Sequence, residues 1–178
     1  MSQTNELEIM ERIALDLEGV EESLASSFNT GAEDFNALIR PLSAAGGKRL
    51  RAQLCLLIAN AGTSIERQRI KIAEAVEMLH LATLIHDDVL DQAEIRRGED
   101  TIHMHKGNKV AILSGDYLFA KAFKIVSEMT NMKYLQVFSH IITCLVEGEF
   151  MQMEDVYRID QGIERYMTKT QKKTADFM

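Results

Sequence analysis

The feature that most constrains the fold is the scarcity of residues that break helices. The chain of 178 residues contains one proline and ten glycines. Apolar residues recur at steps of three and four, as at Leu7, Met10, Ile13 and Leu17, which is the period of an amphipathic helix. No alternating apolar and polar pattern longer than four residues indicates a strand. The sequence therefore predicts an all-α fold, with residues 1–178 forming a single helical domain whose helices are long enough to make a bundle.

The expected helices follow from this periodicity and from the residues that end it. Pro41 is expected to stop the second helix, and Thr63 or Ser64 to cap the fourth. The apolar positions expected along the fourth helix are Ile65, Ile72, Val76, Leu79 and Leu84. The predicted helices span about 3–27, 32–40, 48–61, 63 to 92, 108–129, 134–157 and 163 onward, with a loop at 43–47 and a break at 96–98.

Composition and charge exclude several classes of protein. Cys55 and Cys144 are too few for a disulfide framework and lack the spacing of a metal knuckle. The first residues do not resemble a signal peptide, and no apolar run approaches the length of a membrane span, so we expect a cytoplasmic protein that does not span a membrane. The net charge of −7 lies entirely in residues 1–40. This argues against nucleic acid as a partner, yet it leaves the remaining cations available for an anionic ligand.

The sharpest motif is DDVLD at 87–91, which follows the pattern DDxxD near the end of a helix. Asp87 and Asp91 are four residues apart, so both carboxylates project from one helix face. Like charges at this spacing repel each other, and the helix dipole disfavours anions at a C-terminal end. A divalent cation between them would explain the arrangement, and oxygen ligands with a phosphate partner suit Mg²⁺. The motif alone could equally be a solvated acidic helix end.

Several cations flank this motif. Two glycines precede a predicted helix that carries Lys48 and Arg51 on one face, and glycines before a helix N-terminus with nearby cations are typical of anion sites. His80 lies two helical turns before the first aspartate, on the same face. Arg96 and Arg97 follow in the next loop. The combination predicts a site for two polyanionic phosphates, one bound through Mg²⁺ and one bound directly by cations.

From about residue 40 onward the chain resembles the trans-isoprenyl diphosphate synthases, also called polyprenyl synthetases. The motifs that carry the resemblance occur in family order: GGKRLR at 46–51, HLATLIHDDVLDQAEIRRG at 80–98, SGDYL at 114–118, GEFMQ at 148–152, and Tyr166 seven residues before Lys173-Thr174-Ala175. The sequence is most similar to the large subunits of bacterial hexaprenyl and heptaprenyl diphosphate synthases. The resemblance implies an isoprenoid-synthase-type helical bundle.

The same resemblance implies a prenyltransferase that condenses an allylic diphosphate with isopentenyl diphosphate, head to tail. The product would be a medium- or long-chain all-trans polyprenyl diphosphate, made by Mg²⁺-dependent ionisation and condensation. Asp87, Asp91, Arg96 and Lys173 are the catalytic residues that it implies. The implied ligands of isopentenyl diphosphate are Lys48, Arg51, His80 and Arg97, and those of the allylic diphosphate are Arg96, Lys173 and, through Mg²⁺, Asp87 and Asp91 with Asp88 beside them.

The family also carries a second aspartate-rich motif in its C-terminal half, and this sequence contains no second DDxxD. We therefore expect a bundle truncated after the first aspartate-rich half, with little or no turnover by the chain alone. We expect a homodimer, with or without a small regulatory subunit. In the family, bulky aromatics four and five positions before the first aspartate stop chain growth. The small residues Thr83 and Ala82 stand there, so the prenyl tail is expected to pass toward Leu79.

Two other functions remain open. The doublet His86-Asp87 in a helical protein is also typical of HD-type metal-dependent phosphohydrolases, although that fold recruits its histidines from separate helices. A non-catalytic partner subunit of a synthase would keep the same fold. A terpene cyclase shares the first aspartate motif, but GGKRLR at 46–51 argues against it.

Three further polar residues have simple structural interpretations. His103 and His105 could form a metal pair, but no third ligand is evident, so helix packing or a polar contact in a loop is the simpler interpretation. Asp116 is interpreted as a capping acid.

Overall fold

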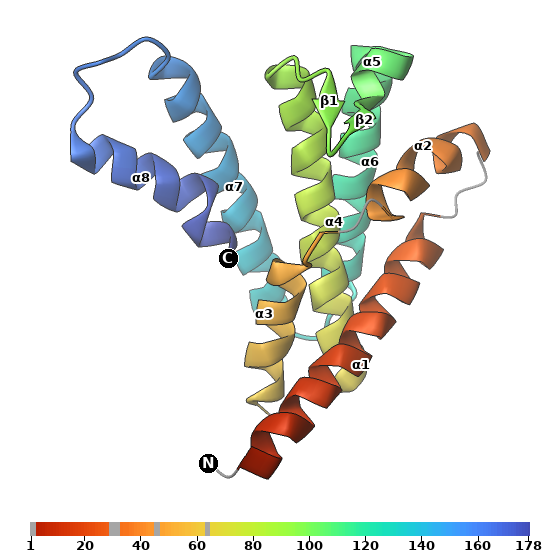
Figure 1. Cartoon of the computed structure of the whole chain (residues 1–178). Helices are drawn as coiled ribbons and strands as arrows, with labels where there is room; N and C mark the ends of the chain where they lie inside the picture. The colour runs from red at the N-terminus through yellow and green to blue at the C-terminus, as the bar shows by residue number, and fades with distance from the viewer. Residues whose placement is uncertain (1–2, 29–32, 45–46, 63–64) are drawn as a thin grey trace. The chain divides into compact units, whose positions relative to one another are not determined.

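The computed structural model describes residues 3–28, 33–44, 47–62 and 65–178, which form two compact units, residues 1–128 and 129–178. Every long element in the described residues is a helix, so the expectation of an all-α fold is confirmed (Figure 1). The first unit contains α1 (Gln3–Ser27), α2 (Glu33–Ala44), α3 (Leu50–Asn60), α4 (Glu66–Leu90), β1 (Ile95–Arg96), β2 (Glu99–Asp100), α5 (Ile102–Lys106) and α6 (Asn108–Ser127). The second contains α7 (Met132–Glu154), α8 (Ile163–Lys173) and the short 3-10 helix η1 (Ala175–Phe177).

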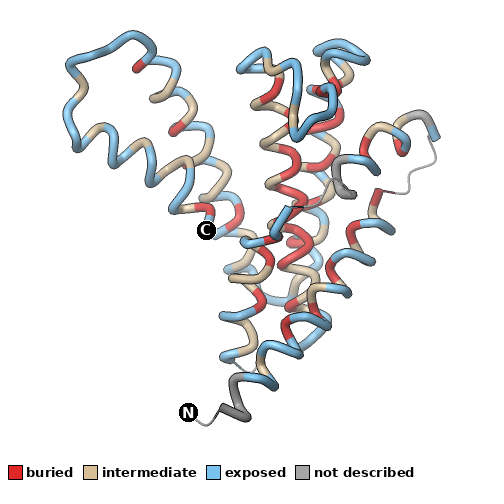
Figure 2. Tube along the Cα trace, viewed as in Figure 1, coloured by how far each residue is buried: buried red, intermediate tan, exposed pale blue. Residues whose placement is uncertain are grey.

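Helix α4 is the centre of the first unit and packs against α1, α3 and α6 (Figure 1). Its small residues Ala73, Ala75 and Ala82 let the neighbouring helices come close, while Met78 and Leu79 fill the space between them. All five side chains are fully buried, and buried positions run along most of the helix (Figure 2). Because α4 is anchored along its length, the residues near its C-terminal end are held in a defined direction.

Buried charges also join α1 to α4. Arg69 donates from Nε to Asp16 at 2.9 Å and from Nη2 to the other oxygen of the same carboxylate at 3.2 Å. The fully buried carboxylate of Glu74 accepts hydrogen bonds from Ser23 at 2.7 Å and Ser27 at 2.6 Å. A buried charge is tolerated only with such partners, because removing it from water is costly. These contacts therefore fix α1 against the central helix.

Several predicted helix limits need correction. Helix α2 does not stop at Pro41 but continues to Ala44. A proline removes one backbone hydrogen bond of a helix, and here only three further residues follow it, so the helix tolerates the loss close to its end. The loop expected at 43–47 therefore does not include residues 43 and 44, which are helical, and its residues 45–46 lie outside the described residues. The caps predicted at 63 and 64 lie outside the described residues, and Ile65 occupies the N-cap position with an exposed side chain instead of a place in the core.

Two features between α4 and α6 were not predicted. Strands β1 and β2 pair antiparallel, with Ile95 opposite Asp100. They are too short to give an alternating pattern. The two residues between them, Arg97 and Gly98, have φ values of 55° and 88°, as in the two-residue hairpin turns of type I′. The predicted break at 96–98 is thus a tight hairpin, and the short helix α5 follows it.

The second unit is a pair of helices, α7 and α8, closed by η1. Its buried residues include Phe138, Cys144 and Phe177. The loop between the helices is held by Asp155, which accepts hydrogen bonds from Arg165 at 2.5 Å and Lys169 at 3.0 Å. None of the helices in the described part of the chain is long and apolar enough to cross a bilayer.

Candidate functional site

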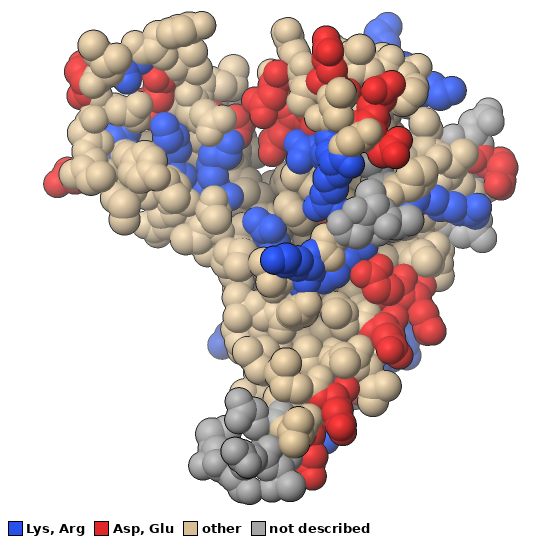
Figure 3. Space-filling view, in the orientation of Figure 1, with Lys and Arg blue, Asp and Glu red and all other residues tan. Residues whose placement is uncertain are grey.

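A cavity of about 240 Å³ lies where the start of α3 meets α4 and the β1–β2 hairpin. Its lining includes Lys48 and Arg51 from the beginning of α3, His80 from α4 and Arg97 from the hairpin turn. Lys and Arg side chains gather over this part of the first unit (Figure 3). The structure thus brings together the four residues that the sequence predicted as ligands of isopentenyl diphosphate, from three separate segments of the chain.

Close contacts define the shape of this cationic cavity. Arg51 Nη1 lies 3.4 Å from His80 Nε2. A Cβ atom at Gly47 would lie 3.2 Å from Arg97 Nη2, closer than most real contacts of this kind, so a glycine suits this position. Lys48 is exposed, whereas Arg51 and His80 are half-buried. The cavity therefore has a half-buried Arg51–His80 pair in its wall and an exposed lysine at its solvent side.

The electrostatics of the cavity favour an anionic ligand. Burial, followed by the repulsion of nearby guanidinium groups, lowers the pKa of His80 from its ordinary 6.5 to about 4. The imidazole is therefore neutral at neutral pH. Burial also lowers the pKa of Arg51, and the carboxylate of Glu77 opposes that effect. The guanidinium groups that repel a proton on His80 belong to Arg51, Arg97, Arg96 and Arg49.

The aspartate-rich motif occupies the C-terminal end of α4. Asp87 is half-buried in the last turn, and Asp91 is the exposed C-cap residue, whose backbone N–H donates to Asp87 O at 2.8 Å. The described residues contain no group of three or more His, Cys, Asp or Glu side chains that could hold a metal ion. Two carboxylates one helical turn apart can still be part of an Mg²⁺ site, because this ion usually keeps several waters and binds substrate phosphates.

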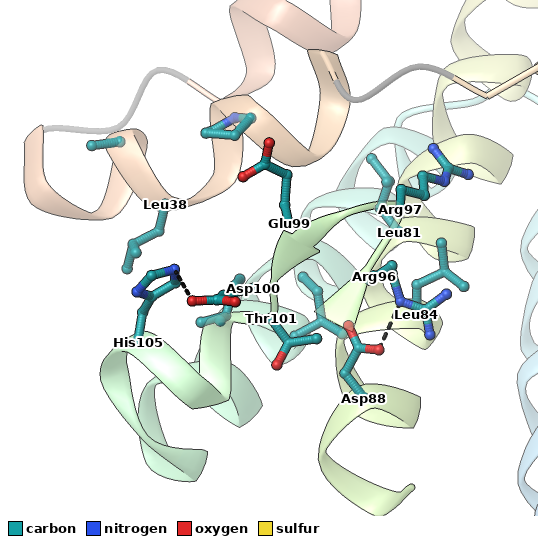
Figure 4. A pocket seen from close by; sticks show the side chains of 14 residues that line it. Leu38, Leu81, Leu84, Asp88, Arg96, Arg97, Glu99, Asp100, Thr101 and His105 are labelled. Carbon is teal, nitrogen blue, oxygen red and sulfur yellow. Dashed lines mark hydrogen bonds and ion pairs between the residues drawn. The ribbon is translucent and has the colours of Figure 1, made fainter. Parts of the chain in front are cut away.

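The middle aspartate of the motif has a different partner. Asp88 is buried, and its Oδ1 accepts a hydrogen bond from Arg96 Nε at 2.7 Å (Figure 4). This pair connects the end of α4 to strand β1. Asp88 therefore holds Arg96, one of the residues predicted to bind the allylic diphosphate, in a defined position at the end of α4.

His86 is directed at α6. Its Nε2 lies 3.2 Å from Ile112 O and 3.4 Å from Asp116 Oδ1. A Cβ atom at Gly115 would lie only 2.2 Å from this nitrogen, so any larger residue there would displace the His86 ring. Asp116 is in the interior of α6, which means that its interpretation as a capping acid is wrong. His103 and His105 make local polar contacts: His103 Nδ1 with Thr101 Oγ1 at 2.9 Å, and His105 Nε2 with Asp100 Oδ2 at 3.6 Å.

A larger cavity, of about 660 Å³, lies between α2, α4 and the segment from β1 to α5. Leu38 and Leu84 contribute to its apolar wall, and Arg97 lines both cavities (Figure 4). Sequence reasoning missed this cavity, because it depends on α2 passing the hairpin, and no local pattern reports such packing.

The residues predicted to set product length lie along α4. Leu79 and Ala82 are fully buried, while Thr83 is half-buried and donates from Oγ1 to His80 O at 2.8 Å. Neither of the two cavities described above is lined by these residues. Their role in product length stays a prediction.

Lys173, the last predicted ligand, belongs to the second unit. Its Nζ lies 2.5 Å from Glu149 Oε2 and 2.9 Å from Gln152 Oε1, both in the GEFMQ segment of α7. A Cβ atom at Gly148 would lie 2.7 Å from Lys173 Cγ, so this glycine lets α8 approach α7. Two of the predicted family motifs therefore meet at this lysine.

The fold is that of the isoprenoid synthases. It matches a polyprenyl synthase from Caulobacter crescentus, crystallised with calcium and isoprenyl diphosphate, with a TM-score of 0.88 and 34% identity over 94% of this chain and 52% of that one. It also matches the heptaprenyl diphosphate synthase of Staphylococcus aureus, with a TM-score of 0.88 and 29% identity over 93% and 52%.

Sequence comparison gives the family. The family model described as polyprenyl synthetase matches residues 32–178. Component 2 of the heptaprenyl diphosphate synthase of Geobacillus stearothermophilus is 38% identical over 161 residues, which are 90% of this chain and 50% of that protein. The octaprenyl diphosphate synthase of Escherichia coli is 34% identical over 94% of this chain and 52% of its own length. The chain belongs to the polyprenyl synthetase family, as its motifs predicted, and it spans about half the length of these relatives.

Proposed function

We propose that this chain carries diphosphate-binding sites of a trans-polyprenyl diphosphate synthase. Such an enzyme condenses isopentenyl diphosphate with an allylic diphosphate, head to tail, and makes medium- or long-chain all-trans polyprenyl diphosphates. The family supports the class of reaction, and relatives named heptaprenyl and octaprenyl diphosphate synthases support the product class. The alternative of an HD-type phosphohydrolase has no support in these comparisons.

The single observation that carries the proposal is the cationic cavity. A diphosphate carries several negative charges, and Arg and Lys side chains bind such groups through charge-assisted hydrogen bonds. Arg51 and Arg97 supply guanidinium groups, Lys48 supplies an exposed ammonium group, and His80 supplies an imidazole that can donate one hydrogen bond while neutral. This set of donors, with no carboxylate except Glu77 in the lining, suits the diphosphate of isopentenyl diphosphate.

The aspartate-rich end of α4 suits a metal-bound diphosphate. Asp87 and Asp91 provide hard oxygen donors but too few of them to complete a coordination sphere, so the remaining positions are available to water and to phosphate oxygens. This donor set fits Mg²⁺. When bound there, Mg²⁺ would neutralise negative charge on the allylic diphosphate.

The proposed reaction needs no nucleophilic side chain. The allylic C–O bond ionises, the isopentenyl double bond attacks the resulting carbocation, and a proton is lost to the released diphosphate. The residues of the chain bind and orient: Arg96 would present positive charge to the leaving diphosphate, which stabilises the charge that develops there. The resemblance assigns the same role to Lys173 of the second unit. The ion pair with Asp88 holds the Arg96 side chain in one orientation for this interaction.

We also propose a cytoplasmic homodimer, with or without a small regulatory subunit. The name of the Geobacillus relative, component 2 of a heptaprenyl diphosphate synthase, supports an assembly that contains a second subunit. Light scattering tests the dimer directly: a mass near the 20.1 kDa of one chain would contradict it.

Calorimetric titration of isopentenyl diphosphate into the chain, without Mg²⁺, tests the proposed function. We expect saturable binding that Lys48→Ala weakens by about tenfold, since one charge-assisted hydrogen bond is lost. Lys109→Ala is a matched control, because Lys109 is also an exposed lysine close to a helix start but does not line the cavity. No binding to the wild-type chain, or equal losses in the two variants, would show that the cavity is not the site.

A further inference from the structure

The start of α3 lacks the side chain that normally caps a helix. Its N-cap residue, Arg49, makes no side-chain cap hydrogen bond, and the first turn contains no acidic residue. The first backbone N–H groups of a helix have no partner within the helix, and the N-cap side chain usually accepts from the second or third of them. Something else must satisfy them in this structure.

Glu77 of α4 supplies that acceptor from another helix. Its Oε1 accepts the backbone N–H of Ala52, the third residue of α3, at 3.0 Å. Glu77 is 3% exposed, so the contact is shielded from water. A negative charge at this end of a helix is also favoured by the helix dipole. Glu77 therefore caps α3 across the packing interface between the two helices.

The second oxygen of the same carboxylate contacts Arg49. Its Oε2 lies 3.4 Å from Arg49 Nη1, while Arg49 Nε and Nη2 donate to the carboxylate of Glu21 at 2.6 and 3.1 Å. Arg49 has a φ of 46°, a left-handed conformation that costs about 1–2 kcal/mol for a residue with a side chain. The two carboxylates, one from α1 and one from α4, stabilise the arginine in this conformation.

Arg49 stands between the two cations of the diphosphate cavity. Lys48 precedes it, Arg51 follows two residues later, and both line the cavity together with Glu77 itself. On α4, Glu77 and His80 are three residues apart and so lie on the same face. Glu77 fixes the backbone at the start of α3, and His80 Nε2 lies 3.4 Å from Arg51 Nη1.

We infer that Glu77 is a positioning residue of the cationic cavity, which caps α3 from α4 and, with Glu21, holds Arg49 so that Lys48 and Arg51 face a bound diphosphate. This inference rests on the proposed function. Glu77 would not touch the substrate; it acts through the backbone of α3 and through Arg49. As a consequence, a change at Glu77 should alter binding in this cavity and leave the aspartate-rich end of α4 unaffected.

Glu74 provides a matched control. It is also a buried glutamate on α4, one turn earlier, and it also contacts α1, through Ser23 and Ser27. It does not line the cavity. If buried glutamates on this helix only stabilise the fold, substitutions at Glu74 and Glu77 should affect the affinity for isopentenyl diphosphate equally. If Glu77 positions the cavity, only substitutions at Glu77 should weaken this affinity.

The experiment compares the full chain with Glu77→Ala, Glu77→Gln and Glu74→Gln by calorimetry and thermal melting. One titration measures Kd for isopentenyl diphosphate without Mg²⁺, and the other measures the Mg²⁺-dependent part of the affinity for a bisphosphonate. We expect Glu77→Ala to raise the first Kd by about tenfold or more, since it leaves a buried N–H and a buried guanidinium short of a partner. Glu77→Gln keeps an oxygen for Ala52 and should weaken binding less.

Glu74→Gln should leave the Kd for isopentenyl diphosphate within about twofold of wild type even if it lowers the melting temperature. Three results would overturn the positioning role and leave the proposed function standing. Glu77→Ala could bind isopentenyl diphosphate as wild type does, or Glu74→Gln could lose as much affinity for it. Glu77→Ala could also lose as much affinity for the bisphosphonate as for isopentenyl diphosphate. If Glu77→Ala does not fold, the near-isosteric Glu77→Gln decides. Failure of the wild-type chain to bind isopentenyl diphosphate would overturn the proposed function and this inference together.

Discussion

The cationic cavity and the aspartate-rich end of α4 lie on the same helix but are built in different ways. Residues of the cavity come from the start of α3, from α4 and from the hairpin turn, and two contacts join α3 to α4, Arg51 with His80 and Ala52 with Glu77. Asp87 and Asp91 come from one helical turn, and Asp91 is exposed. The cavity is therefore shaped by contacts between separate segments, whereas the two carboxylates owe their arrangement to a single helical turn.

This difference also concerns the strength of the electrostatic interactions. Charges in a partly buried cavity interact through a lower effective dielectric constant than exposed charges do, and salt screens them less. The cavity should therefore bind a diphosphate in the absence of a divalent cation, while the aspartates should bind one only together with such a cation. The predictions below separate the two regions on this basis.

The largest expected effect is at the aspartates. Asp87→Ala and Asp91→Ala should each abolish the Mg²⁺-dependent part of bisphosphonate binding, because a single remaining carboxylate does not form the paired site. Calorimetric titration with and without Mg²⁺ measures this. Glu128→Ala is the control, since Glu128 is an exposed acid at the C-cap of α6 and should have no effect. If either aspartate variant kept the wild-type ratio of the two affinities, the metal role of that residue would be wrong.

The second effect is at the centre of the cavity. Arg51→Ala should raise Kd for isopentenyl diphosphate by about 10–100-fold without Mg²⁺, since hydrogen bonds to charged groups contribute about 1.5–3 kcal/mol each. The Mg²⁺-dependent bisphosphonate affinity should stay near the wild-type value. Arg12→Ala, at an exposed position of α1, should change neither. A larger loss at the bisphosphonate than at isopentenyl diphosphate would reverse the assignment of the two regions.

A third measurement tests how tightly the side chains around Ala82 of α4 are packed. If Ala82 is part of a well-packed core, Ala82→Phe should lower the free energy of unfolding by about 1–3 kcal/mol, because the ring has no space. Urea denaturation measures this, with Leu113→Phe at an exposed position of α6 as the control. An Ala82→Phe chain as stable as wild type would instead indicate room for a prenyl tail, and in an active synthase the same substitution should shorten the product.

The smallest effect is the pH dependence that His80 contributes. Its pKa is lowered from 6.5 to about 4, chiefly by burial, so the unfolded chain binds more protons than the folded chain between these values. The neutral His80 therefore costs the folded chain no stability above about pH 6.5, and the free energy of unfolding falls as the pH drops from 6.5 toward 4. His80→Gln removes this pH dependence. Urea denaturation from pH 4 to 7 should show wild type losing stability relative to this variant on acidification; parallel curves would contradict the lowered pKa.

The sequence by itself determined the features that depend on neighbours along the chain. Apolar periodicity gave most helices to within a few residues, because an amphipathic helix repeats every 3.6 residues. The spacing of Asp87 and Asp91 placed both on one helix face, since residues four apart are neighbours there. The motifs at 46–51 and 80–98 indicated the family, which the comparisons confirmed.

Only the tertiary structure decided how separate segments meet. Pro41 lies within a helix, Arg97 forms a hairpin turn, and Asp88 binds Arg96; none of this follows from spacing. The cap that Glu77 provides for Ala52 joins residues 25 positions apart. Such contacts depend on which faces of α3 and α4 pack together, and local sequence patterns encode the faces but not their partners. Long-range packing therefore determines the shape of the cavity.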